Sequence, residues 1–259
     1  MKHIVYDTKK QLILPETINE VTGTQLIELA AILNTNLKRK DAQLRCLRTM
    51  SGLRFLDWYR LPAAIKVQAM PFIEWCFDDF TLTKQVLPEY KGFYGPKSEL
   101  ENLTLSEFYF AELYYSQHLA GDADAINNLV AVLYRKGKFL YHKLKDKDGD
   151  IRVPFNANLI FYYANIISDW PMPVKQAIVL FYDGCRKDIA NNNPKIFNAA
   201  GSSESNGQAD MFGILRSLSG GKYGDLEKVE KMYLHTALLE MNICIQENEE
   251  MQAKMKKTA

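Results

Sequence analysis

The first apolar positions of the chain fall in two short runs. His3–Tyr6 and Leu12–Leu14 lie on either side of the polar tetrad Asp7–Lys10, and Pro15 follows the second run. Two short apolar runs around a polar turn are typical of a β-hairpin. Because a lone hairpin is marginally stable in water, we expect this one at an edge or packed on helices.

Beyond the hairpin, apolar residues recur at helical spacing almost throughout. Side chains at i, i+3, i+4 and i+7 share one face of an α-helix. With capping residues as start signals, the pattern predicts helices beginning at Thr24, Asp41, Pro62, Thr104 (with Glu107, a capping box), Asp122 or Asp124, Asn156, near Val174, near Ala209 and at Asp225. Pro71 predicts a kink or a break just before it, and Gly52, Gly121 and Gly137 are expected near helix ends. The predicted fold class is mainly α, a multi-helix globular domain with a small N-terminal β-hairpin.

Polar and glycine-rich stretches predict the loops. Residues 84–102 and 138–155 read as long loops, and AAGSSESNGQ at 199–208 as a mobile loop. The part of the chain after this loop is too small for an independent domain. With no internal repeat, we expect a single mainly helical domain over residues 1–259.

Composition and charge narrow the class of protein. Hydrophobic residues make up 47% of the 259 residues and charged residues 24%, as in ordinary globular proteins. The net charge of +1 implies no global attraction to nucleic acid, so no nucleic-acid partner is expected. The basic clusters at 38–48 and 136–147 are interpreted as solvated faces, and Asp146, Asp148 and Asp150 interrupt the second.

Targeting and redox signals point to the cytoplasm. The four cysteines (Cys46, Cys76, Cys185 and Cys244) include no CxxC pair and lie in apolar helical contexts, which favours buried free thiols in a reducing compartment. The N-terminus lacks the apolar core of a signal peptide. The longest apolar run, LIFYYANII at 159–167, is far shorter than the ~20 residues of a membrane span. We expect no membrane association.

No motif in the sequence predicts catalysis or metal binding. In an EF-hand loop starting at Asp146, position six would be Ile151 and position twelve Ala157, so the calcium pattern fails. No two of the four histidines have the i, i+4 spacing of a helical metal site. The glycines at 220–224 lack P-loop spacing. We therefore predict no cofactor, no metal and no enzyme, although an active site assembled from distant residues stays open.

Aromatic and heptad-like positions are the candidate protein-binding residues. Aromatic side chains are favoured anchors at interfaces, although core packing and base stacking are alternative roles. A repeat of Leu, Leu, Met and Ile along the last helix suggests a packing face against another helix or a partner. The candidates are Tyr90, Phe93, Tyr94, Phe108, Tyr109, Tyr114, Tyr115, Leu234, Leu238, Met241 and Ile245.

Five segments of the sequence have a familiar pattern and order. They are LPETINEVTGTQLIELA (14–30), YGPKSELENLTLSEFYFAELYY (94–115), NNLVAVLYR (127–135), GDIRVPFN (149–156) and ILRSLSGGKYGDLEKVEKM (214–232). Together they resemble a group of tailed-phage and prophage proteins from Bacteroidetes hosts. Ile18 stands where the group usually has tryptophan. Related phage proteins are described as tail-assembly chaperones or tail structural components.

This resemblance implies a role in phage tail assembly. The expected function is a chaperone or tail accessory protein that binds a helical tail protein such as the tape-measure protein, in the cytoplasm of the host bacterium. The alternative is a structural virion component of the tail or neck, such as a connector or tail-completion protein, and an enzyme ranks third. The expected partners are other phage tail proteins, and a homo-oligomer is compatible with either leading function.

Overall fold

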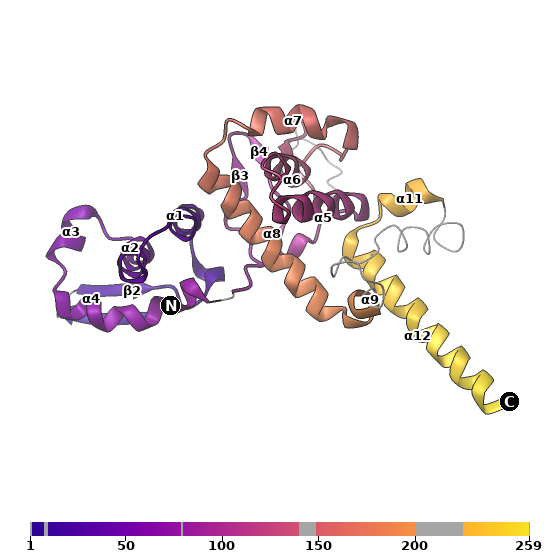
Figure 1. Ribbon diagram of the computed structural model, residues 1–259, viewed down its shortest axis with the longest axis horizontal. Coiled ribbons are helices and arrows are strands. Elements are labelled where there is room, and N and C mark those ends of the chain that lie inside the picture. The colour runs from indigo at the N-terminus through magenta and orange to yellow at the C-terminus, as the bar shows by residue number, and fades with distance from the viewer. Residues whose placement is uncertain (1, 8–9, 79, 140–148, 200–224, 259) are drawn as a thin grey trace. The chain divides into compact units, whose positions relative to one another are not determined.

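The computed structural model describes residues 2–7, 10–78, 80–139, 149–199 and 225–258 (Figure 1). These residues divide into two compact units. Unit 1 comprises residues 1–88 and 168–185, and unit 2 comprises residues 89–167 and 186–259. The predicted mainly helical class with a small N-terminal hairpin is confirmed. The prediction that residues 1–259 fold as one domain stays a prediction.

Unit 1 packs short helices against the hairpin. Its elements are β1 (Lys2–Asp7), β2 (Lys10–Leu14), the 3-10 helix η1 (Ile18–Glu20), α1 (Gly23–Leu33), α2 (Arg39–Ser51), α3 (Phe55–Arg60), α4 (Ala63–Ala69), the 3-10 helix η2 (Met70–Phe77) and the first part of α8 (Met172–Asn192). The two strands are antiparallel, with Ile4 opposite Leu12. Leu12 and Leu14 are buried and Ile13 is exposed. Contacts of β2 with α2 and of β1 with α4 give the hairpin the support that it needs.

Two predicted helix caps in unit 1 are wrong, the first by two residues and the second by three. Thr22, not Thr24, caps α1, because Gln25 completes a capping box with it: Gln25 N donates to Thr22 Oγ1 (3.3 Å) and Thr22 N donates to Gln25 Oε1 (2.8 Å). Asp41 lies in the first turn of α2, which Lys38 precedes as N-cap without a side-chain hydrogen bond.

The breaks in unit 1 follow glycine and proline as predicted. Gly52 ends α2 in the left-handed region, with a φ of 60°. Pro62 is the N-cap of α4, just before the predicted first turn. α4 stops at Ala69, and a 3-10 helix carries the chain through Pro71, so the predicted break is confirmed. The sequence pattern did not predict α3 as a helix of its own.

Three of the four cysteines are buried free thiols. Cys46 on α2 and Cys76 on η2 share a hydrogen bond, which lowers the pKa of the Cys46 thiol and, together with burial, raises that of Cys76. Cys185 donates to the carbonyl oxygen of Leu82 (3.7 Å). Cys244 in unit 2 is only half-buried.

Unit 2 consists of packed helices and a small three-stranded antiparallel sheet. Its elements are β3 (Glu89–Tyr90), β4 (Phe93–Tyr94), the 3-10 helix η3 (Ser98–Leu100), α5 (Leu105–Leu119), α6 (Ala125–Leu133), β5 (Arg135–Lys136), the 3-10 helix η5 (Ala157–Leu159), α7 (Ile160–Ile167), the end of α8, α9 (Pro194–Ala199), α11 (Leu226–Glu230) and α12 (Leu234–Thr258). α6 lies against both α5 and α7 (Figure 1).

The capping box of α5 is confirmed. Glu107 N donates to Thr104 Oγ1 (3.3 Å) and Thr104 N donates to Glu107 Oε2 (2.7 Å). Asp124 is the N-cap of α6 without a side-chain hydrogen bond. α6 ends at Leu133, before the predicted Gly137, because Arg135 and Lys136 pair with β4 as β5.

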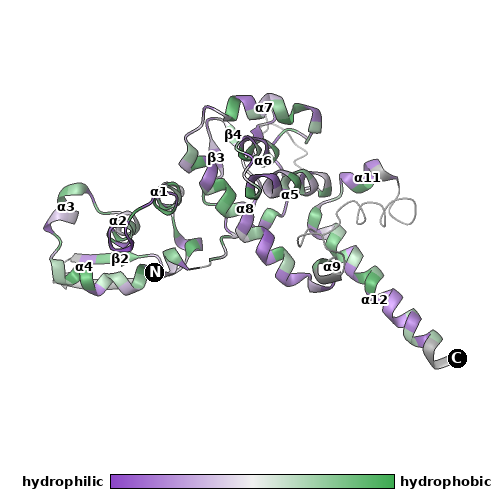
Figure 2. Ribbon diagram, viewed as in Figure 1, coloured by the Kyte–Doolittle hydropathy of each residue, from purple (hydrophilic) through white to green (hydrophobic). Residues whose placement is uncertain are grey.

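Asp225 caps a helix, but not the long terminal one. Its side chain accepts from Lys228 N (3.2 Å), and α11 ends at Glu230. The next residues leave the helix to pair with the start of α5: Leu105 N donates to Met232 O (2.9 Å) and Leu234 N donates to Leu103 O (2.8 Å). The long helix, α12, therefore begins only at Leu234, and its hydropathy falls toward the C-terminus (Figure 2).

Several predicted features lie outside the described residues. They are residues 200–208 of the predicted mobile loop 199–208, the predicted helix near 209–218, the glycine turn at 220–224, and Asp146 and Asp148. Among the helices that the structure does describe, none has the length and apolar character needed to cross a membrane.

Candidate protein-binding site

The structure buries about half of the sequence-predicted binding residues. Six are buried: Phe93, Phe108, Tyr114, Tyr115, Leu234 and Leu238. Five are half-buried: Tyr90, Tyr94, Tyr109, Met241 and Ile245. The six buried side chains form part of the core of unit 2 and offer no surface to a partner in this structure. Protein binding by the half-buried members stays a prediction.

Packing of α5 on its neighbours explains the burial of its aromatic residues. α5 contacts α6 along one face and also meets α11 and α12. Phe110 lies beside Tyr109 (5.2 Å between ring centroids) and beside Phe155 (5.7 Å). Loss of hydration raises the pKa of the hydroxyls of Tyr109 and Tyr114.

A cluster of charges, buried except for the half-buried Asp150, lies at the start of α5. We call Glu107, Arg135, Asp150 and Arg152 the buried charge cluster. Glu107 forms ion pairs with Arg135 and, at 3.7 Å, with Arg152. Asp150 accepts from Arg152 Nε (3.0 Å) and Nη2 (2.8 Å). Each charge therefore has a partner of opposite sign, as a buried charge requires.

Both arginines also donate hydrogen bonds to main-chain carbonyl oxygens. Arg152 donates to Asn102 O (2.9 Å) and Leu133 O (3.1 Å), and Arg135 donates to Val153 O (2.9 Å). Burial lowers the pKa of Arg135, and the nearby Glu107 opposes that shift. Because Glu107 and Arg152 are 1% exposed, a substrate could not reach them in this structure. The cluster fixes the residues around 150–153 to the ends of α5 and α6, which is a structural role.

The outer face of α7 is an exposed apolar surface that sequence reasoning missed. We call Phe161, Tyr162 and Ile166 of α7, together with Leu159 at the end of η5, the α7 face. Phe161 is 65% exposed and Tyr162 62%, and the other two are each 38% exposed. Exposed apolar clusters on a soluble protein mark interaction sites more often than isolated apolar side chains do. A signal was present in the sequence: apart from Asn165, the run LIFYYANII consists of apolar and aromatic residues, whereas a surface helix has a whole polar face.

The inner face of the same helix holds it in place. Ile160, Ala164 and Ile167 are buried, and α7 packs along α6. Tyr163 meets Phe93 edge to face, with 5.8 Å between the ring centroids. The exposed rings of the α7 face therefore stand on a fixed platform, which lowers the entropy cost of binding a partner.

Exposed apolar side chains also lie on α12. Leu239 (60% exposed) and Ile243 (38%) are four residues apart, as are Met251 (55%) and Met255 (64%). The start of the helix is anchored by buried Leu234 and Leu238, and Asn242 Nδ2 donates to Asn193 Oδ1 (2.8 Å). The two pairs lie about 120° apart around the helix axis at ~100° per residue, so they form two small apolar patches, with Glu247, Glu249 and Glu250 between them along the chain.

In the part of the chain that the structure describes, no group of three or more His, Cys, Asp or Glu residues could hold a metal ion. Comparisons with protein-family models, with curated proteins and with solved structures found no match for this chain.

Proposed function

We propose that this protein acts in phage tail assembly as a chaperone or tail accessory protein that binds a helical tail protein, with the tape-measure protein as the foremost partner. The α7 face is the observation that carries the proposal, because it is an apolar helix surface held rigidly at an exposed position. The resemblance of five segments of the sequence to tailed-phage and prophage proteins supplies the biological context.

The physical task of such a chaperone is to cover apolar helix faces until the tail tube assembles. A long helical protein exposes an apolar stripe along its length, and this stripe aggregates when it has no partner. A rigid apolar helix can pack against that stripe, with aromatic anchors filling the gaps between its side chains. Because the chaperone must leave again, a small contact area is suitable, and the α7 face has only four exposed apolar side chains.

Co-expression with the tape-measure protein of the same phage tests the proposal. We expect the tape-measure protein to stay soluble and to co-purify with the wild-type chain. Replacing Phe161 and Tyr162 together by Ser should reduce co-purification about tenfold or more, since loss of an interface anchor costs at least ~1–2 kcal/mol.

The matched control is Leu119→Ser, which removes an exposed apolar side chain (68% exposed) elsewhere in unit 2. It should co-purify like the wild type. If the Phe161/Tyr162 variant recovered as much tape-measure protein as the wild type, the α7 face would not be the contact. Failure of the wild-type chain to recover any tail protein would contradict the proposed function. Mass spectrometry of purified particles separates the alternatives: a stoichiometric presence in the virion would favour the structural component.

A further inference from the structure

Unit 1 carries a concentration of positive charge that the balanced net charge conceals. Residues 38–66 contain eight basic and two acidic residues, in a chain whose net charge is +1. All eight basic side chains are exposed except Lys66, which is half-buried. They are Lys38, Arg39, Lys40, Arg45, Arg48, Arg54, Arg60 and Lys66. Of these, Arg39 pairs with Glu74 (3.0 Å), while Arg45, Arg54 and Arg60 have no ion pair with any described residue.

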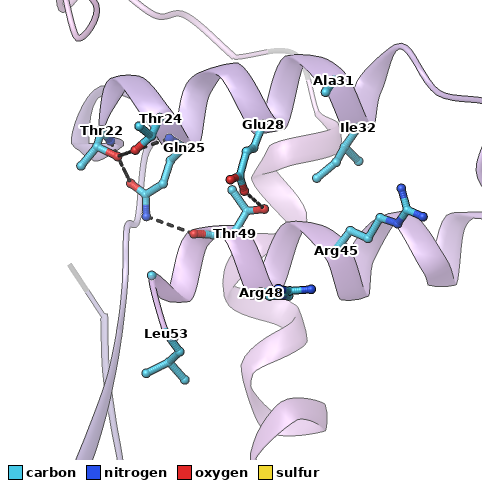
Figure 3. Close-up of a pocket in the computed structure, with 11 residues that line it drawn as sticks. Thr22, Thr24, Gln25, Glu28, Ala31, Ile32, Arg45, Arg48, Thr49 and Leu53 are labelled. Atoms are coloured by element: carbon cyan, nitrogen blue, oxygen red, sulfur yellow. Dashed lines mark hydrogen bonds between the residues drawn. The ribbon is translucent and has the colours of Figure 1, made fainter. Parts of the chain in front are cut away.

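Two of these arginines border a groove between α1 and α2. The groove has a volume of about 740 Å³, with Thr24, Glu28 and Ile32 on the α1 side and Arg45, Arg48 and Thr49 on the α2 side. Figure 3 shows Arg45 and Arg48 projecting from α2. Guanidinium groups bind phosphate oxygens through paired hydrogen bonds, so this wall of the groove suits a phosphodiester chain.

Exposed aromatic rings continue the basic surface. On α3, Phe55 is 56% exposed and Tyr59 68%, and their ring centroids are 4.7 Å apart. The guanidinium of Arg48 lies 5.4 Å from the centroid of the Phe55 ring, which links the aromatic pair to the groove. Trp58, three residues after Phe55 on α3, is buried and anchors the helix.

We propose that the α1–α2 groove and the Phe55–Tyr59 pair together bind single-stranded nucleic acid. Arginines that neutralise phosphates beside exposed aromatic rings that stack on unpaired bases are the recurring combination in such sites. The net charge of +1 does not oppose this proposal, because the positive charge is concentrated within residues 38–66. The surface belongs to unit 1 and is independent of the α7 face, so either proposal can fail alone.

Glu28 provides a test within the groove itself. Its carboxylate lies among the groove residues and accepts a hydrogen bond from Thr49 Oγ1 (2.8 Å). A negative charge there opposes a phosphate, so Glu28→Gln should tighten binding of a nucleic acid while keeping an acceptor for Thr49.

Fluorescence anisotropy with a labelled oligothymidylate of roughly 15 nucleotides, long enough for a typical single-strand site, is the decisive measurement. We expect the full chain to bind it, with log K falling about 0.7 per neutralised phosphate for each tenfold rise in salt. Arg45→Gln with Arg48→Gln should weaken binding about tenfold, and Tyr59→Ala about fivefold or more. Glu28→Gln should strengthen it severalfold.

The controls separate this site from a general attraction for polyanions. Asn36→Gln, an exposed substitution that changes no charge in the same unit, should bind like the wild type. Circular dichroism should give each variant the wild-type spectrum. No binding of the oligonucleotide, tighter binding of duplex DNA, equal competition by polyglutamate, binding of anionic phosphatidylglycerol vesicles alone, or unchanged affinity in Tyr59→Ala would each overturn the proposal.

Discussion

Glu107 has two roles at once, as the capping-box residue of α5 and as the carboxylate that faces Arg135 and Arg152 in the interior. We expect Glu107→Ala to lower the free energy of unfolding by about 3–5 kcal/mol, because it leaves two buried arginines short of a counter-charge. Urea denaturation followed by circular dichroism measures this change.

Glu112→Ala is the matched control for that variant. Glu112 also lies on α5 and pairs with Arg186 (2.8 Å), but the Arg186 side chain is 29% exposed, so water can solvate it after the change. The decrease in the free energy of unfolding should be clearly smaller than for Glu107→Ala, on the order of 1–2 kcal/mol. Equal losses for both variants would mean that the buried charge cluster is no more important than an ordinary ion pair.

Burial of Tyr114 predicts a dependence of stability on alkaline pH. Its pKa is raised in the folded chain above the ordinary ~10, so above that pH the unfolded chain loses the proton first. The folded state then binds more protons than the unfolded state, and stability falls as pH rises through the unfolded pKa. In Tyr114→Phe, the fall in urea midpoint between about pH 9 and 11 should be shallower than in wild type. An unchanged slope would contradict this reading.

At the level of residues, prediction from the sequence succeeded more often for side chains that stabilise the fold than for side chains on the surface. It found the capping box of Thr104 and Glu107 because that motif is local. It could not tell that Phe108, Tyr114 and Tyr115 are buried, because one helix with aromatics on several faces leaves open which of them a neighbour covers. The partners of Glu107 lie 28 and 45 residues further along the chain, and no local pattern joins them.

Among the elements, α8 approaches the segment before β3 too closely for any side chain at Gly184. A Cβ there would lie 2.4 Å from the backbone nitrogen and oxygen of Leu82. Gly184→Ala should therefore destabilise the protein by roughly 1–3 kcal/mol, although alanine is the better helix former. Thermal unfolding by calorimetry would register a lower midpoint, and a raised midpoint would show that the contact relaxes easily.

Breaks at proline and glycine were predicted well, whereas a boundary that depends on pairing with a distant segment was not predicted. Pro71 and Gly52 act through their own backbone, and both breaks appear where expected. The gap between α11 and α12 depends on main-chain pairing of residues 232–234 with 103–105, which a periodic apolar pattern cannot reveal. The α7 face was missed for a different reason, since its apolar run was weighed only as a membrane span.

On the scale of the whole molecule, unit 1 is assembled from two separate stretches of chain. Leu82 is fully buried in it, and its backbone meets Gly184 and Cys185 of α8. We expect a fragment of residues 1–88 to unfold less cooperatively than the full chain and to bind a hydrophobic dye. Addition of a peptide of residues 168–185 should reduce the dye binding and restore part of the cooperativity of unfolding. A fragment that unfolds sharply and ignores the peptide would show that the first stretch is sufficient alone.

The same division sets an order of events during synthesis. The first stretch of unit 1 ends at residue 88, and its second stretch is complete only at residue 185. About 100 further residues must therefore leave the ribosome before the N-terminal unit can close, a wait of roughly 5–20 s at typical bacterial elongation rates. During that interval the hairpin and the first helices are exposed in the nascent chain, although they were made first.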